Sequence, residues 1–409
     1  MNVDELVRDA LREQAAEQAP AGAGLADRVL AVRRRRRTRR IAALAAATVA
    51  VVAVAVAVPV LDSDRGNDVR PADVVPKTEV TAHPDQSPPR DLIAAGNTAL
   101  AAYYIPKTVK KTSDTAVYQR TYWLLNQKTG TYEKTTKWSW VAVAPGMKTA
   151  AVLEQDLPAS RIGLLDLTTG KVERWIPVDH GVGGLAFSRD GSKLVATTYG
   201  ENPDLRVKME GSDGWDQKQP SSRTGFHVLD VASGKGSWSE VALGSENDPD
   251  EPMGGGFLNS RQDFALTGDG THVWAGHPMG DIGKQFFDLS GAEVSVPAKD
   301  KYLEWYVEAG KSPDGRLVAG QFAGEKWKTS SWVVDAVTGK RTEVHGQQLL
   351  AWVGNSSLVA WDIAKGGKNE FHQRLVLVTI GSDKIVPLSD FRKGSDGDAG
   401  RWEPVFAER

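Results

Sequence analysis

Two segments carry side chains of the kinds that bind ions or ligands. Residues 200–225 and 244–256 are rich in acids, and the second segment also holds three consecutive glycines. Carboxylate oxygens at alternating positions suit Ca²⁺, but neither segment contains the Asp-x-Asp-x-Asp-Gly loop of a calcium site. We therefore favour solvated acidic loops, and loops of this length are where a rigid fold commonly binds its partners. The candidate ligand or partner contacts are Trp215, Asp213, Asp216, Asp248 and Asp250.

Trp215 is the best single candidate for an exposed recognition residue. It lies in a polar stretch without a strand pattern, so nothing in its neighbourhood predicts that it belongs to the core. The alternative is that its indole packs beneath its own loop, because large aromatic side chains gain most when they are buried.

Motifs of common catalytic sites are incomplete or missing. Gly310-Lys311-Ser312 matches the end of a phosphate-binding loop, but Trp305 stands where that loop requires its first glycine. No Gly-x-Ser-x-Gly pentapeptide occurs, and the seven histidines are scattered, as core or surface residues would be. The chain has no cysteine, which excludes disulfides, thiolate metal sites and a cysteine nucleophile. We expect no catalytic residue, metal or cofactor.

Residues 41–61 form an apolar run without a charged residue. A helix of this length spans roughly 30 Å, the thickness of a bilayer's hydrocarbon core. Arginines preceding such a helix resist translocation, so the first forty residues should stay in the cytoplasm and the remainder should lie outside. A cleaved signal peptide is the alternative, but its leading region would be much shorter. The topology signal consists of Arg33, Arg34, Arg35, Arg36, Arg37, Arg39 and Arg40.

The flanking segments complete a four-part organisation. Residues 1–40 form a cytoplasmic tail, with an amphipathic helix from Val3 to Leu11 that rests on the inner leaflet or docks a cytoplasmic partner. Residues 62–90 contain five prolines among polar residues and predict an extended extracytoplasmic linker. Residues 91–409 remain for one large β domain.

Charge separates the two sides of the predicted membrane helix. Residues 1–40 carry a formal net charge of +4 and the part beyond the apolar run carries −6. Because phosphate recognition requires a basic surface, the outer part is not expected to bind nucleic acid. The expected partners are membrane lipid at residues 41–61 and an envelope polymer or protein at the outer domain.

A repeating pattern runs from about residue 92 to the end. Apolar strands alternate with tight glycine turns, and the same hairpin turn returns at intervals of about 40 residues or more. One four-stranded antiparallel sheet per 40 to 50 residues indicates the blades of a β-propeller. The recurring turn glycines are Gly130, Gly170, Gly234, Gly291, Gly339 and Gly381.

The pattern also predicts how the ring closes. The first repeat has no good strand before Gly96, whereas the chain ends in an apolar segment around Phe406. We expect this segment to pair with the strand at Leu100 and so remove an open sheet edge. The predicted fold is an all-β propeller of six blades, with seven as the alternative, closed by the C-terminal strand.

The turns resemble those of a known repeat family. Ser312-Pro313-Asp314-Gly315 and the Asp-x-x-Thr-Gly-Lys hairpin that begins at Asp335 resemble WD40-like repeats, also called TolB-like or PD40 repeats. The whole layout resembles the membrane-anchored WD40-like proteins of high-GC Gram-positive bacteria. That resemblance implies a propeller fold and leaves the function open.

Three functions remain from the sequence. The first is a non-catalytic binding or scaffold module held at the cell membrane, which the repeats and the missing catalytic motifs favour. The second is a single-pass sensor that signals through its cytoplasmic helix. The third is a hydrolase or lyase whose groups converge from separate blades on the central channel, which no single sequence can reveal.

Overall fold

The computed structural model describes most of the chain beyond residue 78. The described residues are 79–211, 213–219, 221–241, 261–276, 283–363, 369–394 and 400–409. The chain divides into two units at Leu61, and all described residues belong to the second unit. Within them, no helix is long and apolar enough to cross a bilayer. The predicted membrane helix, its seven arginines and the acids Asp248 and Asp250 lie outside the described residues.

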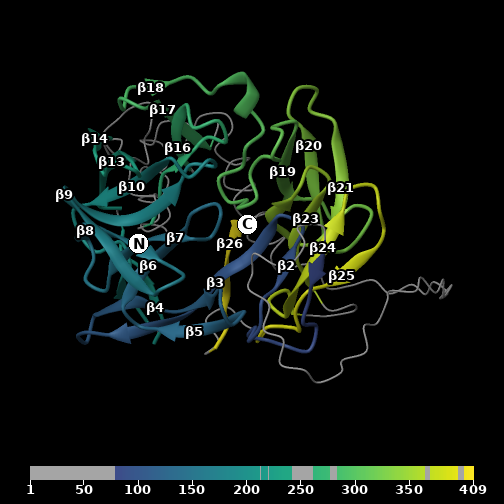
Figure 1. The fold of residues 1–409 in the computed structure, drawn as a ribbon, viewed down its shortest axis with the longest axis horizontal. Coiled ribbons are helices and arrows are strands. Elements are labelled where there is room, and N and C mark those ends of the chain that lie inside the picture. Colours follow the sequence, from purple (N-terminus) through teal and green to yellow (C-terminus); the bar gives the residue numbers. More distant parts are fainter. Residues whose placement is uncertain are drawn as a thin grey trace, which may run out of the picture. The chain divides into compact units, whose positions relative to one another are not determined.

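The first sheet combines strands from distant parts of the chain (Figure 1). Its centre is a long hairpin formed by residues 98–126. The end of this hairpin pairs with an insertion at residues 205–217, and residues 403–408 pair with the other side of its first strand. Its strands are β1 (Val80–Thr81), β2 (Ala94–Ala95), β3 (Thr98–Lys110), β4 (Thr115–Asn126), β5 (Thr131–Thr135), β11 (Leu205–Lys208), β12 (Trp215–Gln217) and β26 (Glu403–Glu408).

The second sheet contains two antiparallel groups that share one strand of 17 residues, β9. The first part of β9 pairs with β8 and its last part pairs with β10. Its strands are β6 (Trp138–Val143), β7 (Thr149–Glu154), β8 (Ala159–Asp166), β9 (Lys171–Phe187), β10 (Lys193–Tyr199), β13 (Arg223–Asp230) and β14 (Gly236–Glu240).

Three smaller antiparallel sheets follow in chain order. The third holds β15 (Ala265–Leu266), β16 (His272–Gly276), β17 (Lys284–Asp288) and β18 (Glu293–Val294), followed by the 3₁₀ turn η3 (Ala298–Asp300). The fourth holds β19 (Leu317–Phe322), β20 (Ser330–Asp335) and β21 (Arg341–His345). The fifth holds β22 (Gln348–Val353), β23 (Ser357–Ile363), β24 (Gln373–Thr379) and β25 (Ile385–Pro387).

Glycine turns join the outer strands as predicted. All six recurring turn glycines have positive φ, between 69° and 90°, which a side chain with a Cβ rarely adopts. At Gly170, the amide donates to the Asp166 carbonyl at 2.8 Å, and the Asp166 carboxylate accepts from the amide of Thr168 at 2.6 Å. The repeated Asp and Gly therefore form the hairpin geometry itself.

The core consists of clusters that lie between successive sheets. Ile162 of β8 packs with Leu185 and Leu194 across the second sheet, and Phe226 of β13 packs with Phe264 at the start of the third. Further clusters join the third sheet to the fourth, the fourth to the fifth, and the first to β6–β8. A last cluster brings Trp361 of the fifth sheet against Leu100 and Tyr103 of the first. The order of sheets is therefore cyclic, and this arrangement defines a β-propeller.

The last strand meets the first sheet as the sequence predicts. β26 pairs antiparallel with β3, and Phe406 lies opposite Leu100. Beyond the strand, the Arg409 amide donates to the Asn97 carbonyl at 2.7 Å, and the Asn97 side chain donates to Glu408 at 2.9 Å. The prediction of a returning C-terminal strand is confirmed.

Two short segments form strands that the sequence pattern does not indicate. Strand pairing extends ahead of residue 91, because β1 pairs with β2 and the His83 amide donates to the Leu388 carbonyl at 2.9 Å. Trp215 does not lie in an irregular loop, because it belongs to β12, which pairs with β11. Both β1 and β12 are short end strands of the first sheet, and neither has the alternating apolar pattern that predicts a strand.

A buried ionic cluster anchors the insertion that carries β11 and β12. The Asp204 carboxylate accepts two hydrogen bonds from Arg120 of β4, at 2.6 and 3.0 Å, and two from Arg261, at 3.0 and 2.9 Å. Burial alone would raise the pKa of Asp204, but the two guanidinium groups outweigh it and lower the pKa to about 2. Asp204 therefore stays ionised at neutral pH and holds two sheets and the insertion together.

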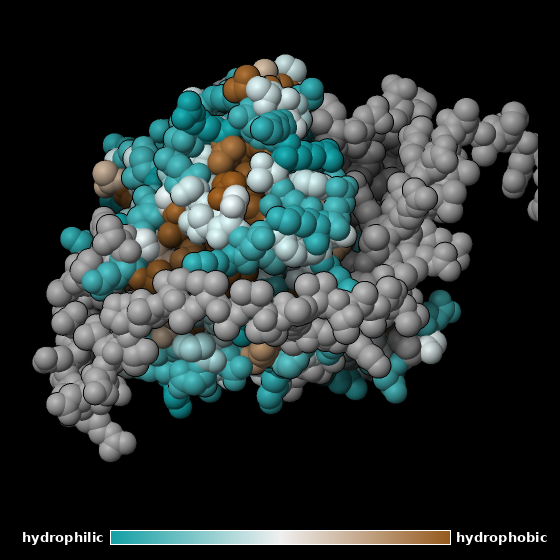
Figure 2. Space-filling view, turned by 90° about the vertical axis from the view of Figure 1, so that its right-hand side faces the viewer, coloured by the Kyte–Doolittle hydropathy of each residue, from teal (hydrophilic) through white to brown (hydrophobic). Residues whose placement is uncertain are grey.

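One face of the described part of the chain is mainly hydrophilic. Figure 2 shows one face on which teal residues predominate and apolar side chains form a narrow band. Five large apolar side chains are exposed among the described residues: Val80, Met209, Phe322, Val337 and Val386.

We expect Ala407→Asp to destabilise the fold by about 3 kcal/mol or more, because it places a carboxylate between the first sheet and β6–β8. Urea unfolding measures the change. Val337→Asp is the matched control, since Val337 is 88 % exposed, and it should change stability by less than about 0.5 kcal/mol. Equal stability of the two variants would contradict the closure of the ring through β26.

Candidate binding cavity

Inner strands of the first, second and fifth sheets line an open-sided cavity of about 490 Å³. Its walls come from β3, the ends of β6 and β9, the segment before β19, β22 and β26. Each element reaches the cavity because an inner strand faces the centre of a propeller. A volume of this size is typical of pockets that hold small ligands or a single group of a larger partner.

Most charged groups of the cavity wall are already paired. Glu403 forms an ion pair with Arg392 at 2.7 Å and a longer one with Arg401 at 3.4 Å. Lys311 forms an ion pair with the buried Asp300 at 2.7 Å. Arg189 donates to the Ser312 carbonyl at 3.1 Å. These side chains shape the cavity and hold neighbouring segments together.

Glu308 is the acid of the cavity wall whose pKa departs most from its ordinary value. Its carboxyl accepts a hydrogen bond from the Gln348 amide at 3.0 Å, and its side chain reaches the space of the cavity. The side chain is exposed to the space of the cavity, but the protein atoms around the carboxyl reduce its hydration. This desolvation, followed by the negative charge of Glu403, raises the pKa of Glu308 to about 7. A carboxyl of this kind donates a hydrogen bond when protonated and accepts one when ionised.

The hydroxyls of the cavity wall are used for structure. Thr98 donates to the Trp352 carbonyl at 2.6 Å, and Ser188 donates to Asp190 at 2.6 Å. Neither hydroxyl contacts a histidine, so among the described wall residues no nucleophile is paired with a base in the manner of a hydrolase. The arrangement is suited to hydrogen bonding and proton exchange with a bound polar group.

The sequence-predicted contacts lie elsewhere. Asp213 and Asp216 are exposed, and Trp215 is half-buried in β12. Asp213 lines a shallow, open depression of about 630 Å³ together with Asp114 and Lys208. The structure thus brings Asp213 next to the β3–β4 hairpin, which the sequence did not predict. Asp248 and Asp250 lie outside the described residues.

Sequence reasoning missed Glu308 and Glu403 because nothing local distinguishes them. The two residues lie about a quarter of the chain apart and meet only when β26 returns to β3. The insertion did leave a signal, since Leu205, Val207 and Met209 alternate with charged residues in the pattern of a half-exposed strand.

The fold and this cavity define a β-propeller with a polar centre. No family model matches the chain, and no curated protein matches it. Among solved structures, it is similar to TolB from Acinetobacter baumannii at 14 % identity, over 71 % of this chain and 67 % of that one, with a TM-score of 0.36.

Two archaeal structures are similar to a comparable degree. The β-propeller domain of the Trilobed protease from Pyrococcus furiosus matches at 14 % identity over 73 % of this chain and 83 % of that one, with a TM-score of 0.38. Pyrococcus horikoshii acylaminoacyl peptidase matches at 13 % identity over 70 % of this chain and 45 % of that one, also at 0.38. Because these TM-scores are low, the propeller assignment comes from the strand pairing and the cyclic core.

We expect Glu308→Gln to remove a pH dependence from stability. Between pH 4.5 and 7 the folded protein keeps a proton on Glu308 that the unfolded chain has lost, so the contribution of Glu308 to stability should fall as pH rises through this window. The stability of the variant relative to wild type should therefore increase over the same window. Urea unfolding at a series of pH values measures this. Glu293→Gln, at an exposed site in β18, should leave the wild-type profile unchanged.

Proposed function

We propose that this protein is a membrane-anchored, extracytoplasmic β-propeller that binds an envelope polymer or protein without transforming it. The central cavity carries the proposal. Its wall offers a proton-exchanging carboxyl at Glu308, while the other charged groups named above are engaged in structural pairs. Such a site binds through hydrogen bonds and shape, and among the described wall residues no hydroxyl is paired with a histidine.

Six blades fit the strand pairing. The shared strand β9 divides the second sheet into two groups of four strands, β6–β9 and β9–β10–β13–β14. The first sheet supplies β26, β3, β4 and β5 as another group of four. The fourth sheet has three strands and an isolated bridge from Lys311 to Val318 in place of an inner strand. With the third and fifth sheets, these groups make six blades.

The ligand is expected to present a polar group that fits the cavity. A carboxyl with a pKa of about 7 accepts from hydroxyls and amines when ionised and donates to carbonyls when protonated. Sugar hydroxyls and peptide groups of an envelope polymer or protein provide such partners. The shallow depression at Asp213 and Lys208 lies on the insertion and offers a second contact area for a long ligand.

Binding should depend on Glu308. We expect purified cell-wall glycan fragments or an envelope protein to bind the full-length chain, and Glu308→Gln to weaken binding by about 10-fold through loss of a charge-assisted hydrogen bond. Glycan arrays and calorimetry measure this, and Glu293→Gln is the control. Conversion of a bound substrate to product would reject the binding module and favour a hydrolase or lyase.

The membrane anchor is supported by the sequence. The uncharged run at residues 41–61 is long enough to span a bilayer, and seven arginines precede it. This orientation places the propeller on the outer side of the membrane, where an envelope ligand is accessible.

The orientation can be tested because the chain has no cysteine. We expect a membrane-impermeant maleimide to label Val337→Cys in intact cells, since Val337 is exposed on the propeller. Asn2→Cys should react only after the cells are permeabilised. The reverse pattern would place the propeller in the cytoplasm, and the cysteine-free parent controls for background labelling.

A further inference from the structure

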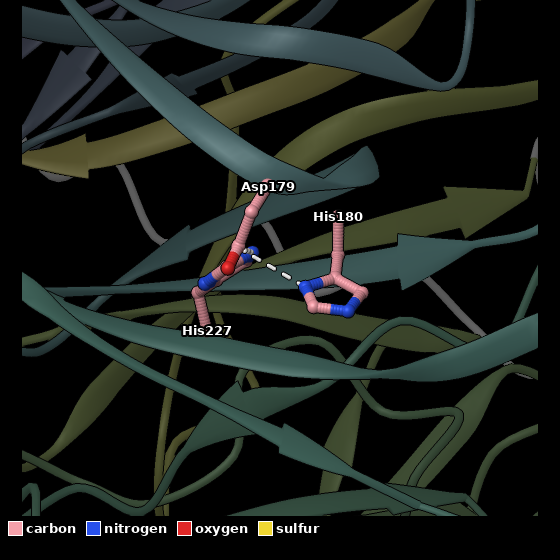
Figure 3. A group of neighbouring side chains, drawn as sticks. All are labelled: Asp179, His180 and His227. Carbon is pink, nitrogen blue, oxygen red and sulfur yellow. Dashed lines mark hydrogen bonds and ion pairs between the residues drawn. The ribbon is translucent and has the colours of Figure 1, made fainter.

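Two imidazoles and a carboxylate converge away from the central cavity (Figure 3). Asp179 and His180 belong to β9, and His227 belongs to β13. The Asp179 Oδ1 atom lies 3.0 Å from His180 Nδ1 and 3.6 Å from His227 Nε2. One donor atom from each of the three side chains falls within 4.8 Å of the others.

A bulge in β9 places the first two residues. Arg161 of β8 pairs with Pro177, but Ala159, only two residues earlier, pairs with Val182. The extra residues of β9 must leave the ladder, and such bulges commonly redirect side chains. Asp179 and His180 lie within this bulge, at the crossing between the two strand groups that share β9.

His227 contributes a buried nitrogen that forms no hydrogen bond with the described residues. The residue is 4 % exposed, and its Nε2 atom forms no hydrogen bond in the part of the chain that the structure describes. A buried polar atom without a hydrogen bond costs free energy, and a ligand bound to that atom would offset the cost. The Nε2 atom faces Asp179 Oδ1 at 3.6 Å, a position from which an imidazole nitrogen can bind a metal ion held between the two side chains.

The imidazole of His180 is held in place by an aromatic ring. It stacks on Trp238 with the ring centroids 3.6 Å apart and the planes 5° from parallel. Trp238 in turn lies opposite His227 on β14 and donates through Nε1 to Thr198 at 3.1 Å. Both imidazoles are therefore positioned by the same strand pair, while Asp179 remains open to solvent.

We propose that Asp179, His180 and His227 bind a divalent transition-metal ion of the zinc type. Ligand atoms at about 2.0 to 2.1 Å from a tetrahedral Zn²⁺ lie about 3.3 Å from one another, and the two measured separations from Asp179 bracket that value. Two imidazoles favour zinc, nickel or copper over calcium and magnesium, which prefer oxygen ligands alone. Three protein ligands leave one position for water.

The bound ion would join β9 to β13 at the boundary between two strand groups. Because Asp179 and His180 come from the bulge and His227 from a regular strand, the metal would fix the path of the bulge. Binding should therefore raise thermal stability in proportion to the logarithm of metal concentration above the dissociation constant.

The test uses the full-length chain after treatment with a chelator. We expect calorimetry to show one equivalent of Zn²⁺ bound, Co²⁺ to give the visible absorption of a four-coordinate site, and Zn²⁺ to raise the melting temperature. Asp179→Asn and His180→Ala should each weaken Zn²⁺ binding by at least about 10-fold. Both residues reach solvent, so these variants should fold, and circular dichroism verifies this.

His272→Ala is the matched control, because His272 lies in β16 outside the cluster. It should retain wild-type affinity, stoichiometry and thermal shift. Zn²⁺ affinity within about 2-fold of wild type in both cluster variants would overturn the proposal. Absence of Zn²⁺ and Co²⁺ binding at millimolar concentrations would also overturn it.

Discussion

Each sheet of this protein has two apolar faces, and neither can be buried except against a neighbouring sheet. The core clusters follow from this constraint, since they lie between successive sheets and return from the fifth to the first. A linear row of sheets would leave two open faces, whereas the ring leaves none. The fully buried Trp361 and Trp402 lie in the cluster that joins the fifth sheet to the first. The largest apolar side chains are thus concentrated at the closing junction.

Ionic contacts have a different role from the apolar core. Asp204 belongs to the insertion, and its buried carboxylate forms ion pairs with Arg120 and Arg261, which come from two other segments of the chain. Desolvating such charges is costly, so the three groups are stable only as a set with good geometry. Trp140 lies within cation–π distance of both guanidinium groups, which gives them an apolar surface as well as a counter-ion. The cluster fixes where the insertion lies on the propeller.

The parts predicted from sequence are those with local causes. Turn glycines require positive φ and the strands require apolar positions, so the repeats followed from the local sequence. The β26–β3 pairing is long-range, but the first repeat lacked a strand and the end of the chain supplied an unassigned one, so the pairing could still be predicted. The cavity acid Glu308 and the Asp179–His180–His227 group depend on segments far apart in the chain. Their chemistry arises from the proximity of groups that only the fold brings together, which a single sequence does not display. Trp215 was misplaced for the same reason, because its strand exists only beside β11 and β4.

The position of β26 in the sequence has a consequence for biogenesis. Among the described strands, β3 is one of the first to be translated, whereas its partner β26 is the last. Until the ribosome has delivered residues 403–408, the nascent chain presents an unsatisfied edge at Ala99 and Leu100, two residues that are fully covered in the finished molecule. Closure of the ring is therefore a late event in folding, because it waits for the segment at residues 403–408.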